Sequence, residues 1–178
     1  MDDSSWFFLK VYAEDGVFFE GKCLELVLPL PDGEKAFLAH HEDAVYAVYN
    51  GTMRFLVPRE ALSGLKKNNS IQDLREEPKE GSKDGSGERS GKDEHGPVWL
   101  EAVIGTGVTY FVNNRCVVLS ETAERPEDID AMRAQRALER AQEKMQQKLS
   151  MREYRISQMA MARATARIRA ANRREEKN

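Results

Sequence analysis

The chain reads Thr122-Ala-Glu-Arg-Pro-Glu-Asp-Ile-Asp-Ala-Met-Arg-Ala134 where its sequence changes character. Short alternating apolar runs, broken by Gly, Pro and Asn, precede this stretch over residues 7–120. No Gly and no Pro occurs from Glu127 to the last residue. Pro126 suits the first position of a helix, because its missing N–H would have no intrahelical partner there. The stretch therefore predicts a junction between a β domain, residues 1–122, and a helical domain, residues 123–178.

The first domain is predicted to consist of short strands, because its apolar residues alternate and turn residues separate the runs. The expected strands are 7–13, 17–20, 22–29, 35–38, 44–49, 52–57, 99–104, 108–112 and 115–120. Asn50-Gly51 predicts a tight hairpin, and Asn113-Asn114 predicts the turn between the last two strands. Alternation within Lys22–Pro29 assigns Cys23, Glu25 and Val27 to one face and the three leucines to the other. Strands at this spacing, with no helix between them, favour an antiparallel sandwich or barrel.

Residues 59–97 interrupt this pattern with eight bases, nine acids and six glycines. Such a composition cannot bury enough apolar surface to offset its ordering entropy, so we expect a disordered loop at about 66–97. A helical turn is expected at Ala61–Leu65. Because loop-closure entropy grows slowly with length, the strands on either side are predicted to pair with each other.

The second domain is predicted to be two helices, at about 127–148 and 151–174, with a break at Leu149-Ser150. Each helix carries a one-sided stripe of apolar residues at spacings of three and four. The stripes are Ala134, Leu138, Ala141, Met145 and Leu149 in the first helix, and Met159, Ala162, Ala166 and Ala170 in the second. Alanine buries little area, so a weakly docked hairpin that can leave the sandwich is predicted, and the same residues would also suit a static hairpin.

Charge is unevenly distributed along the chain. Residues 1–58 carry ten acids and four bases, a net −6, whereas residues 151–178 carry eight bases and three acids, a net +5. A basic tail can meet an acidic surface, a phosphate or another protein's carboxylates, or it can simply be solvated. Cys23 and Cys116 lie in strand-like runs and are expected to be buried thiols. No apolar run approaches the roughly 20 residues that cross a bilayer, so we expect a cytosolic chain without direct membrane insertion.

The residues give little support to catalysis or metal binding by this chain. Gly105-Thr106-Gly107 lacks the pattern of a phosphate-binding loop and is interpreted as a turn between strands. Adjacent side chains in His40-His41-Glu42 diverge on an extended chain, so no metal site is expected. An enzyme that uses these three residues, with or without a metal, remains a separate hypothesis.

Arginines of the tail form a candidate anion site. Arg163, Arg167 and Arg174 share a helix face, and a hairpin could bring two of them near Arg133. Planar guanidinium groups suit phosphate well, and three cations would repel one another without an anion among them. The alternative is an arginine-rich solvated face.

Several segments resemble the epsilon subunit of the F-type ATP synthase. The run from Asn114 to Asp130 matches the family's late strand and its Thr-Ala-Glu-Arg and Asp-Ile-Asp junction. Ala162–Ala171 is similar to the end of the family's second helix. Leu28-Pro29 and Asp32-Gly33-Glu34 resemble its early strands and turn. The resemblance covers nearly the whole chain apart from residues 59–97, and it implies a ten-strand β-sandwich followed by an α-helical hairpin.

The resemblance also implies a function. The family's epsilon subunit is a non-catalytic rotor subunit, with its sandwich against the gamma subunit and the ring of c subunits. Its tail can fold on the sandwich or extend into the alpha/beta catalytic head and hinder ATP hydrolysis. The expected location is the cytoplasmic face of the cell membrane, peripheral and within the complex, with no nucleic-acid partner. A stand-alone ATP-sensing module is the alternative.

The resemblance further implies a regulatory ATP site in the folded tail, and no other cofactor. Its Ile/Leu-Asp-x-x-Arg-Ala motif matches Ile129–Ala134 in full. The implied ATP-binding residues are Glu124, Ile129, Asp130, Arg133, Ala134, Arg163 and Arg167. For the contact with the c ring, only Leu38 and His41 match the family's Leu-Pro-Gly-His loop.

Overall fold

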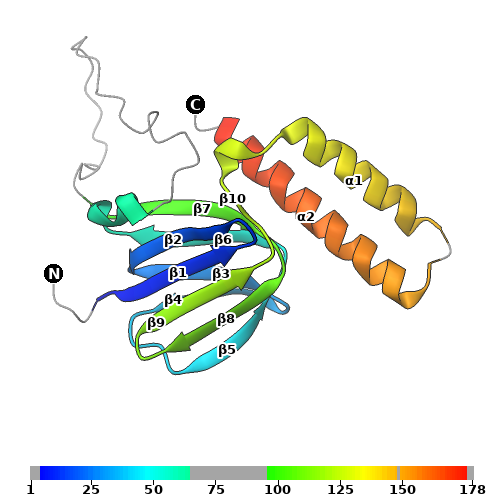
Figure 1. The fold of residues 1–178 in the computed structure, drawn as a ribbon. Helices are drawn as coiled ribbons and strands as arrows, with labels where there is room; N and C mark the ends of the chain where they lie inside the picture. Colours follow the sequence, from blue (N-terminus) through cyan, green and yellow to red (C-terminus); the bar gives the residue numbers. More distant parts are fainter. Residues whose placement is uncertain (1–4, 65–95, 148, 176–178) are drawn as a thin grey trace, which may run out of the picture.

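The computed structural model describes residues 5–64, 96–147 and 149–175 (Figure 1). Within these ranges, ten strands form two five-stranded sheets, and two α-helices follow them. The predicted ten-strand sandwich with a C-terminal helical hairpin is therefore confirmed. The disordered loop predicted at about 66–97 lies almost entirely outside the described residues. The helical turn predicted beside it is present as a 3-10 helix, η1, at Arg59–Gly64.

We call the sheet that contains the first strand sheet A. Its strands lie in the order β2 (Gly16–Cys23), β1 (Phe7–Ala13), β9 (Arg115–Ser120), β8 (Gly107–Val112) and β5 (Ala44–Val48). Neighbours are antiparallel except β1 and β9, which run parallel. The predicted turn between β8 and β9 is confirmed: Asn113 and Asn114 have φ of 50° and 57°, the left-handed conformation that a tight hairpin requires.

Sheet B faces it and is antiparallel throughout. Its order is β10 (Ala123–Glu124), β7 (Val98–Ile104), β6 (Gly51–Val57), β3 (Glu25–Leu30) and β4 (Gly33–Leu38). Strands β6 and β7 pair along their whole length, from Gly51 opposite Ile104 to Val57 opposite Val98. This confirms that the strands on either side of the long interruption are partners.

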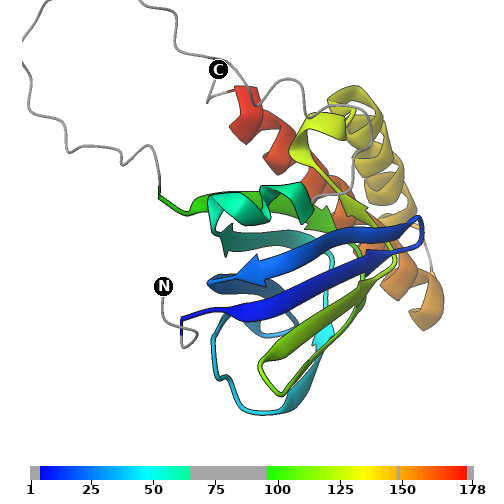
Figure 2. The same ribbon diagram turned by 60° about the vertical axis from the view of Figure 1, so that its left-hand side comes forward.

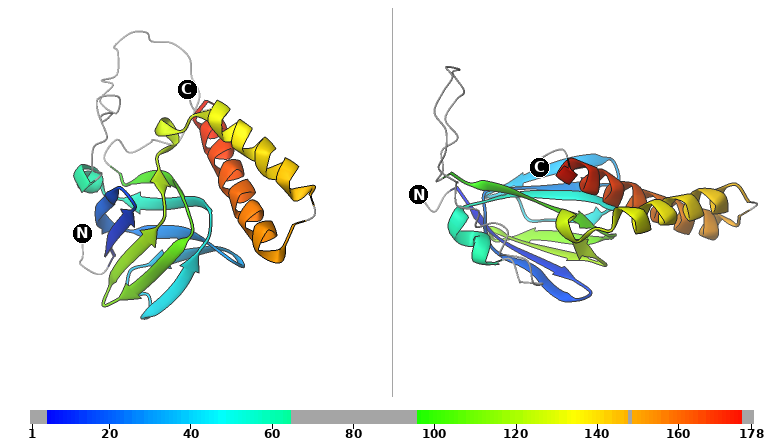
Figure 3. Two further views of the ribbon diagram at one scale, coloured as in Figure 1. Left: turned by 45° about the vertical axis from the view of Figure 1, so that its right-hand side comes forward. Right: turned by 90° about the horizontal axis from the view of Figure 1, so that it is seen from above.

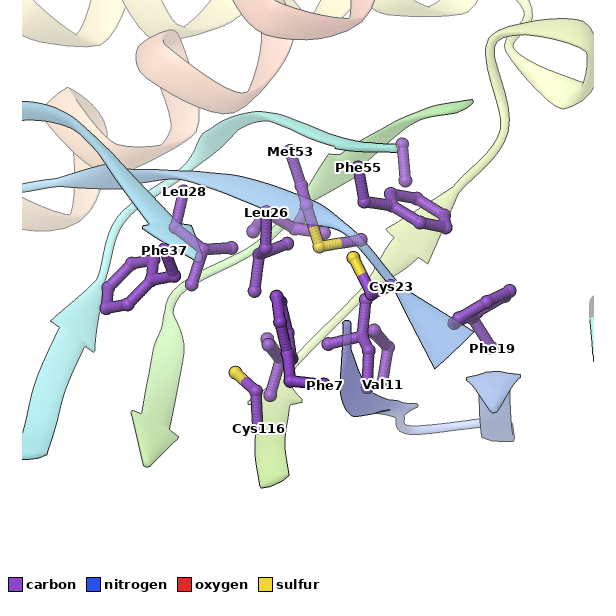
Figure 4. Close-up of a cluster of buried hydrophobic side chains, with 14 of the residues drawn as sticks. Phe7, Val11, Phe19, Cys23, Leu26, Leu28, Phe37, Met53, Phe55 and Cys116 are labelled. Carbon is purple, nitrogen blue, oxygen red and sulfur yellow. The ribbon is translucent and has the colours of Figure 1, made fainter. Parts of the chain in front are cut away.

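Large apolar side chains fill the space between the two sheets (Figure 4). Phe7 packs on Phe111 with ring centroids 5.2 Å apart, and Phe19 packs on Phe55 at 4.9 Å. Cys23 and Cys116 are buried free thiols, as predicted. Burial raises the pKa of both thiols, that of Cys116 to about 11.

The run Lys22–Pro29 is not one strand, contrary to the prediction. Strand β2 ends at Cys23 in sheet A, and β3 begins at Glu25 in sheet B. The chain passes from sheet A to sheet B at Leu24, so the alternation of buried and exposed residues does not continue from β2 into β3. Cys23 is fully buried, and so are Leu26 and Leu28, which the pattern had assigned to the opposite face.

The hairpin predicted at Asn50-Gly51 is also wrong. Strand β5 before it belongs to sheet A and β6 after it to sheet B, so this link crosses between the sheets. Tyr49 donates its backbone N–H to the carbonyl of Pro29 at 2.9 Å. A Cβ on Gly51 would lie 2.8 Å from the Cβ of Pro29. Glycine is needed here for this close approach.

The C-terminal part consists of a 3-10 turn, η3 (Pro126–Asp128), and the helices α1 (Ala131–Met145) and α2 (Met151–Glu175). The first α-helix thus begins four residues later than predicted, because Pro126 opens the 3-10 turn and Asp130 caps α1. The predicted break before α2 is confirmed. There Ser150 and Glu153 form reciprocal hydrogen bonds, a capping box. In the described part of the chain, neither helix is long and apolar enough to span a membrane.

The hairpin lies along sheet B, with its far end projecting beyond the sandwich (Figures 2 and 3). Ala134, Ala141, Ala166 and Ala170 are buried, as the stripes predicted. Met159 and Ala162 are exposed instead. The prediction failed there because this part of the stripe lies toward the end of α2 that projects beyond the sandwich, ahead of Ala166 (Figure 3). Helix α2 also buries a second face. One buried face contains Ala166 and Ala170, which pack with Val103 and Ile129. The other contains Ser157 and Ala164, which are buried and seven residues apart, the spacing expected of a helix face that packs on α1.

Candidate functional site

The segment Ile129–Ala134 forms the start of the hairpin. Ile129 is 9% exposed and packs with Val103, Ala166 and Ala170. The Asp130 carboxylate accepts a hydrogen bond from the backbone N–H of Arg133 at 2.9 Å, the usual N-cap contact. Ala134 is buried. These residues therefore shape and dock α1 in addition to any part they take in binding a ligand.

Two arginines of α2 reach carboxylates of the sandwich. Arg163 Nη2 lies 3.1 Å from Glu121 Oε2, and its Nε donates to Asn50 Oδ1 at 3.3 Å. Arg167 forms an ion pair with Glu124. The structure thus brings Arg167 and Glu124 together, two of the residues that the sequence singled out, and sets Arg163 one turn away on the same helix.

Two more arginines, Arg173 and Arg174, lie toward the end of α2, and together with Arg163 and Arg167 they form a row of arginines along the helix. Arg173 Nη2 lies 3.4 Å from Glu101 Oε2 and 3.3 Å from Thr52 Oγ1. Arg174 Nη1 donates to the carbonyl of Glu127 at 3.0 Å. Each of these guanidinium groups already has an oxygen partner in the folded hairpin.

Arg133 is not part of this row. Its side chain is exposed and has no hydrogen bond or ion pair with the residues that the structure describes. The contact from Arg174 to Glu127 sets the end of α2 beside the start of the hairpin. Arg163 lies eleven residues before Arg174, about 16 Å along a helix axis. The arrangement therefore does not join Arg133 to Arg163.

A phosphate group fits the chemistry of the row. Guanidinium groups donate in a planar fork to phosphate oxygens. The Nε atoms of Arg167 and Arg173 and the Nδ2 of Asn50 are buried and lack a hydrogen-bond partner among the described residues. A phosphate at Arg163 or Arg167 would compete with Glu121 and Glu124 for the exposed side of these guanidinium groups.

The last residue of β4 and the loop that follows it carry the residues predicted to contact the c ring. Leu38 is 56% exposed. The His41 ring instead is half-buried and packs on Phe37 at 5.0 Å and on Phe111 at 5.4 Å. His40 donates its backbone N–H to Asn114 Oδ1 at 2.8 Å, which ties the loop to the β8–β9 turn. Leu38 is therefore the more accessible of the two residues.

His40 and His41 belong to no cluster of metal ligands in the described part of the chain. Over the described ranges, no three His, Cys, Asp or Glu side chains gather as metal ligands would. His41 Nδ1 instead lies 2.8 Å from the carbonyl of Glu42. The hypothesis of an enzyme built on these residues gains no geometric support.

Sequence reasoning missed several residues of the row. Glu101, Glu121, Asn50, Thr52 and Arg173 had no assigned role, yet all of them contact or belong to the row. Apart from Arg173, which is in α2, they come from three places in the chain, and only the pairing of the strands brings these beside the helix. No local pattern could have revealed this.

Comparisons with known proteins agree on one family. A family model described as "ATP synthase, Delta/Epsilon chain, long alpha-helix domain" matches residues 127–172. The chain is 34% identical over 168 residues to the ATP synthase epsilon chain of Ruminiclostridium cellulolyticum, covering 94% of this chain and 97% of that protein. It is 31% identical over 168 residues to the epsilon chain of Caldicellulosiruptor saccharolyticus, covering 94% and 95%.

A chain in the cryo-EM structure of the Euglena gracilis mitochondrial ATP synthase, OSCP/F1/c-ring in rotational state 1, has a similar fold. The TM-score is 0.60 at 16% sequence identity, over 91% of this chain and 79% of that one. At this identity the likeness concerns the fold alone.

Proposed function

Because this chain belongs to the ATP synthase epsilon-chain family, we propose that it couples rotation of the c ring to ATP synthesis and regulates ATP hydrolysis with its C-terminal helices. It is a non-catalytic central-stalk subunit of the ATP synthase. In the proposal it sits peripherally at the cytoplasmic face of the cell membrane as part of that complex. The gamma subunit, the c ring and, for an extended tail, the alpha/beta head are its partners.

The proposed coupling role is supported chiefly by the exposed apolar side chains on the outer face of sheet A. Its large apolar side chains are between 36% and 70% exposed: Val45, Val108, Tyr110, Val112 and Leu119. They are neighbours across strands, with Val45 opposite Tyr110 and Val108 opposite Leu119. A contiguous exposed apolar face is typical of a protein–protein interface. The hairpin packs on sheet B, so it leaves this face free for the gamma subunit (Figure 1).

The c-ring contact is proposed at the loop between β4 and β5. Leu38 offers an exposed apolar side chain there, and His41 stiffens the loop from inside. A loop tied down by hydrogen bonds transmits torque better than one that yields, which suits a rotating contact.

The regulatory role is proposed for the hairpin as a two-state element. ATP that binds the folded hairpin better than the extended one shifts the population toward the folded state. Arg163 and Arg167 would hold its phosphates beside Glu124. Ile129, Asp130 and Ala134 would act indirectly, by shaping and docking the start of α1, and the folded hairpin does not bring Arg133 to the two arginines.

Reconstitution with an epsilon-depleted catalytic head tests the coupling and regulatory roles. The full chain should bind gamma and lower ATP hydrolysis, and deletion of residues 126–178 should keep binding but abolish inhibition. Tyr110→Asp, at the centre of the apolar face, should weaken gamma binding at least about tenfold, because it buries a charge in the interface. Tyr154→Asp, at a tyrosine 43% exposed on α2, is the matched control and should leave gamma binding unchanged. Unchanged hydrolysis and no gamma binding by the full chain would refute the proposal.

Isothermal titration of the full chain tests the nucleotide site separately. Wild-type protein should bind ATP, and Arg163→Ala should abolish binding. Arg155→Ala, at an exposed position of the same helix, should leave it intact. A flat titration at millimolar ATP would remove the nucleotide site and leave the rotor role standing.

A further inference from the structure

Three arginines of α2 each pair with one carboxylate of the sandwich. We call the pairs Arg163–Glu121, Arg167–Glu124 and Arg173–Glu101 the ion-pair row. The arginines span ten residues of a single helix, about 15 Å along its axis. The carboxylates come from β7, β10 and the residue after β9, which share one side of the sandwich. The row therefore runs along the contact between hairpin and sandwich.

The apolar part of the same contact is small. Its buried residues are Val103, Ile129, Ala166, Ala170 and Ala171, with Ala131 at the margin. Three of the five are alanines, which remove little area from water. Between the sheets, by contrast, five phenylalanines are fully buried. The ion pairs consequently carry a larger share of the attraction in docking the hairpin than in folding the sandwich.

The pairs differ in their relation to the proposed nucleotide site. Arg163 and Arg167 are the two arginines that a bound phosphate would engage, and a phosphate there would replace Glu121 or Glu124 as their anion. Arg173 is not among the proposed nucleotide-binding residues. Its partner Glu101 has a side chain only 22% exposed, and Thr52 also accepts from the guanidinium. A phosphate at the other two arginines would leave this pair in place.

We propose that Arg173–Glu101 is the anchor of the hairpin, which holds α2 on sheet B whether or not a nucleotide is bound. Arg163–Glu121 is an exchangeable pair, whose carboxylate is replaced by a phosphate when nucleotide binds. The second statement rests on the proposed nucleotide site, and the first does not. Docking then persists while the ligand enters, because one ion pair stays intact as another exchanges partner.

The position of the hairpin can be measured in the full chain with two spin labels. Labels at Asp15→Cys in the β1–β2 turn and Gln142→Cys on α1 report the distance between sandwich and hairpin, since both positions are exposed. The native thiols are buried with raised pKa and will not take up the label. Thermal melting of the sandwich, followed in parallel, shows whether each variant is folded.

Arg173→Gln and Glu101→Gln should each lower the ratio of docked to undocked hairpin about tenfold, with or without ATP, because each leaves a partly buried charge unpaired. The double variant should be no worse than either single one, the sign of a direct pair. Glu20→Gln, which breaks the ion pair with Lys10 on sheet A, is the matched control and should change nothing. A docked population that survives both single substitutions would overturn the anchor.

Glu121→Gln tests the exchangeable pair separately from the anchor. It should undock the hairpin several-fold without ATP, and saturating ATP should restore docking, because the phosphate supplies the missing anion. If ATP binds this variant but does not restore docking, exchange is refuted. If ATP does not bind even the wild-type chain, the nucleotide site fails, and the anchor is still judged by Arg173→Gln alone.

Discussion

Ile129 offers the clearest test of how the hairpin is held. The side chain is 9% exposed and packs on Val103, Ala166 and Ala170, between the 3-10 turn and α1. Ile129→Ala removes three carbon atoms, at about 0.8 kcal/mol for each buried CH₂. Ile→Ala changes in large cores cost about 2–5 kcal/mol. Because this cluster is small and can close over the gap, we expect the lower end, about 2 kcal/mol.

A loss of about 2 kcal/mol lowers the ratio of docked to undocked hairpin about thirtyfold, since 1.36 kcal/mol is a factor of ten. The distance distribution between spin labels on sandwich and hairpin measures this ratio, without nucleotide. Met132→Ala, three residues along the chain and 66% exposed, is the matched control and should leave the ratio unchanged.

The melting temperature of the sandwich decides what the result means. If Ile129 serves the hairpin, the sandwich melts as before while the hairpin is released. A sandwich that melts earlier, with the hairpin still in place, would refute the view that this cluster is separate from the main core.

Three further predictions concern the stability of the two parts. Phe111→Ala should lower the free energy of unfolding of the sandwich by about 3–5 kcal/mol in urea denaturation, because Phe111 is 1% exposed and packs on Phe7; a loss under about 1 kcal/mol would contradict the described core. Gly107→Ala should lower the melting temperature of the sandwich, because the new Cβ would lie 2.0 Å from the carbonyl oxygen of Leu119 and push β8 away from β9. An unchanged melting temperature would show that the backbone at the start of β8 has more room beside β9 than described. The hydroxyl and the backbone N–H of Ser150 donate to the Glu153 carboxylate and lower its pKa in the folded chain. The capping box therefore stabilises α2 fully above the pKa that Glu153 has in the unfolded chain, and this stabilisation is lost as the pH falls through the lower folded pKa. Glu153→Gln should remove the acid-dependent loss of helix at the start of α2, and an NMR titration of Glu153 with its midpoint at or above 4.5 would contradict the prediction.

The strands were largely predictable because alternation and turn residues act locally. Asn113-Asn114 favours the left-handed conformation by itself, so its hairpin could be foreseen. Asn50-Gly51 carries the same local signal and was misread. The choice between returning along one sheet and crossing to the other depends on which partners β5 and β6 find. Those partners, β8 for β5 and both β3 and β7 for β6, lie elsewhere in the chain.

The helical stripes show a similar limit. A single stripe predicts one buried face, and α1, which packs on one neighbour, obeys it with Ala134 and Ala141. Helix α2 has two neighbours, α1 and sheet B. Its second buried face includes Ser157, a polar residue that an apolar stripe cannot indicate.

The candidate site was predictable on one side only. Arg163, Arg167 and Glu124 were found because a known motif names them. Glu121, Glu101 and Arg173 were not, since an ion pair between α2 and the sandwich depends on how far the helix slides along the sheet. Tertiary packing sets that distance, and no window of sequence contains it.

The alanines and the ion pairs of the hairpin depend on each other. Helix packing distance is set by the side chains at the contact, so short residues such as Ala166 and Ala170 let α2 approach sheet B closely. Larger side chains at these two positions would bury more apolar area but would push the helix outward, beyond the reach of Arg167 and Arg173 to their carboxylates. A contact built from alanine thus gives up hydrophobic attraction and gains charged partners within reach. Its strength then responds to anions and salt, whereas the phenylalanine core of the sandwich does not, so the hairpin can be released without loosening the body that carries it.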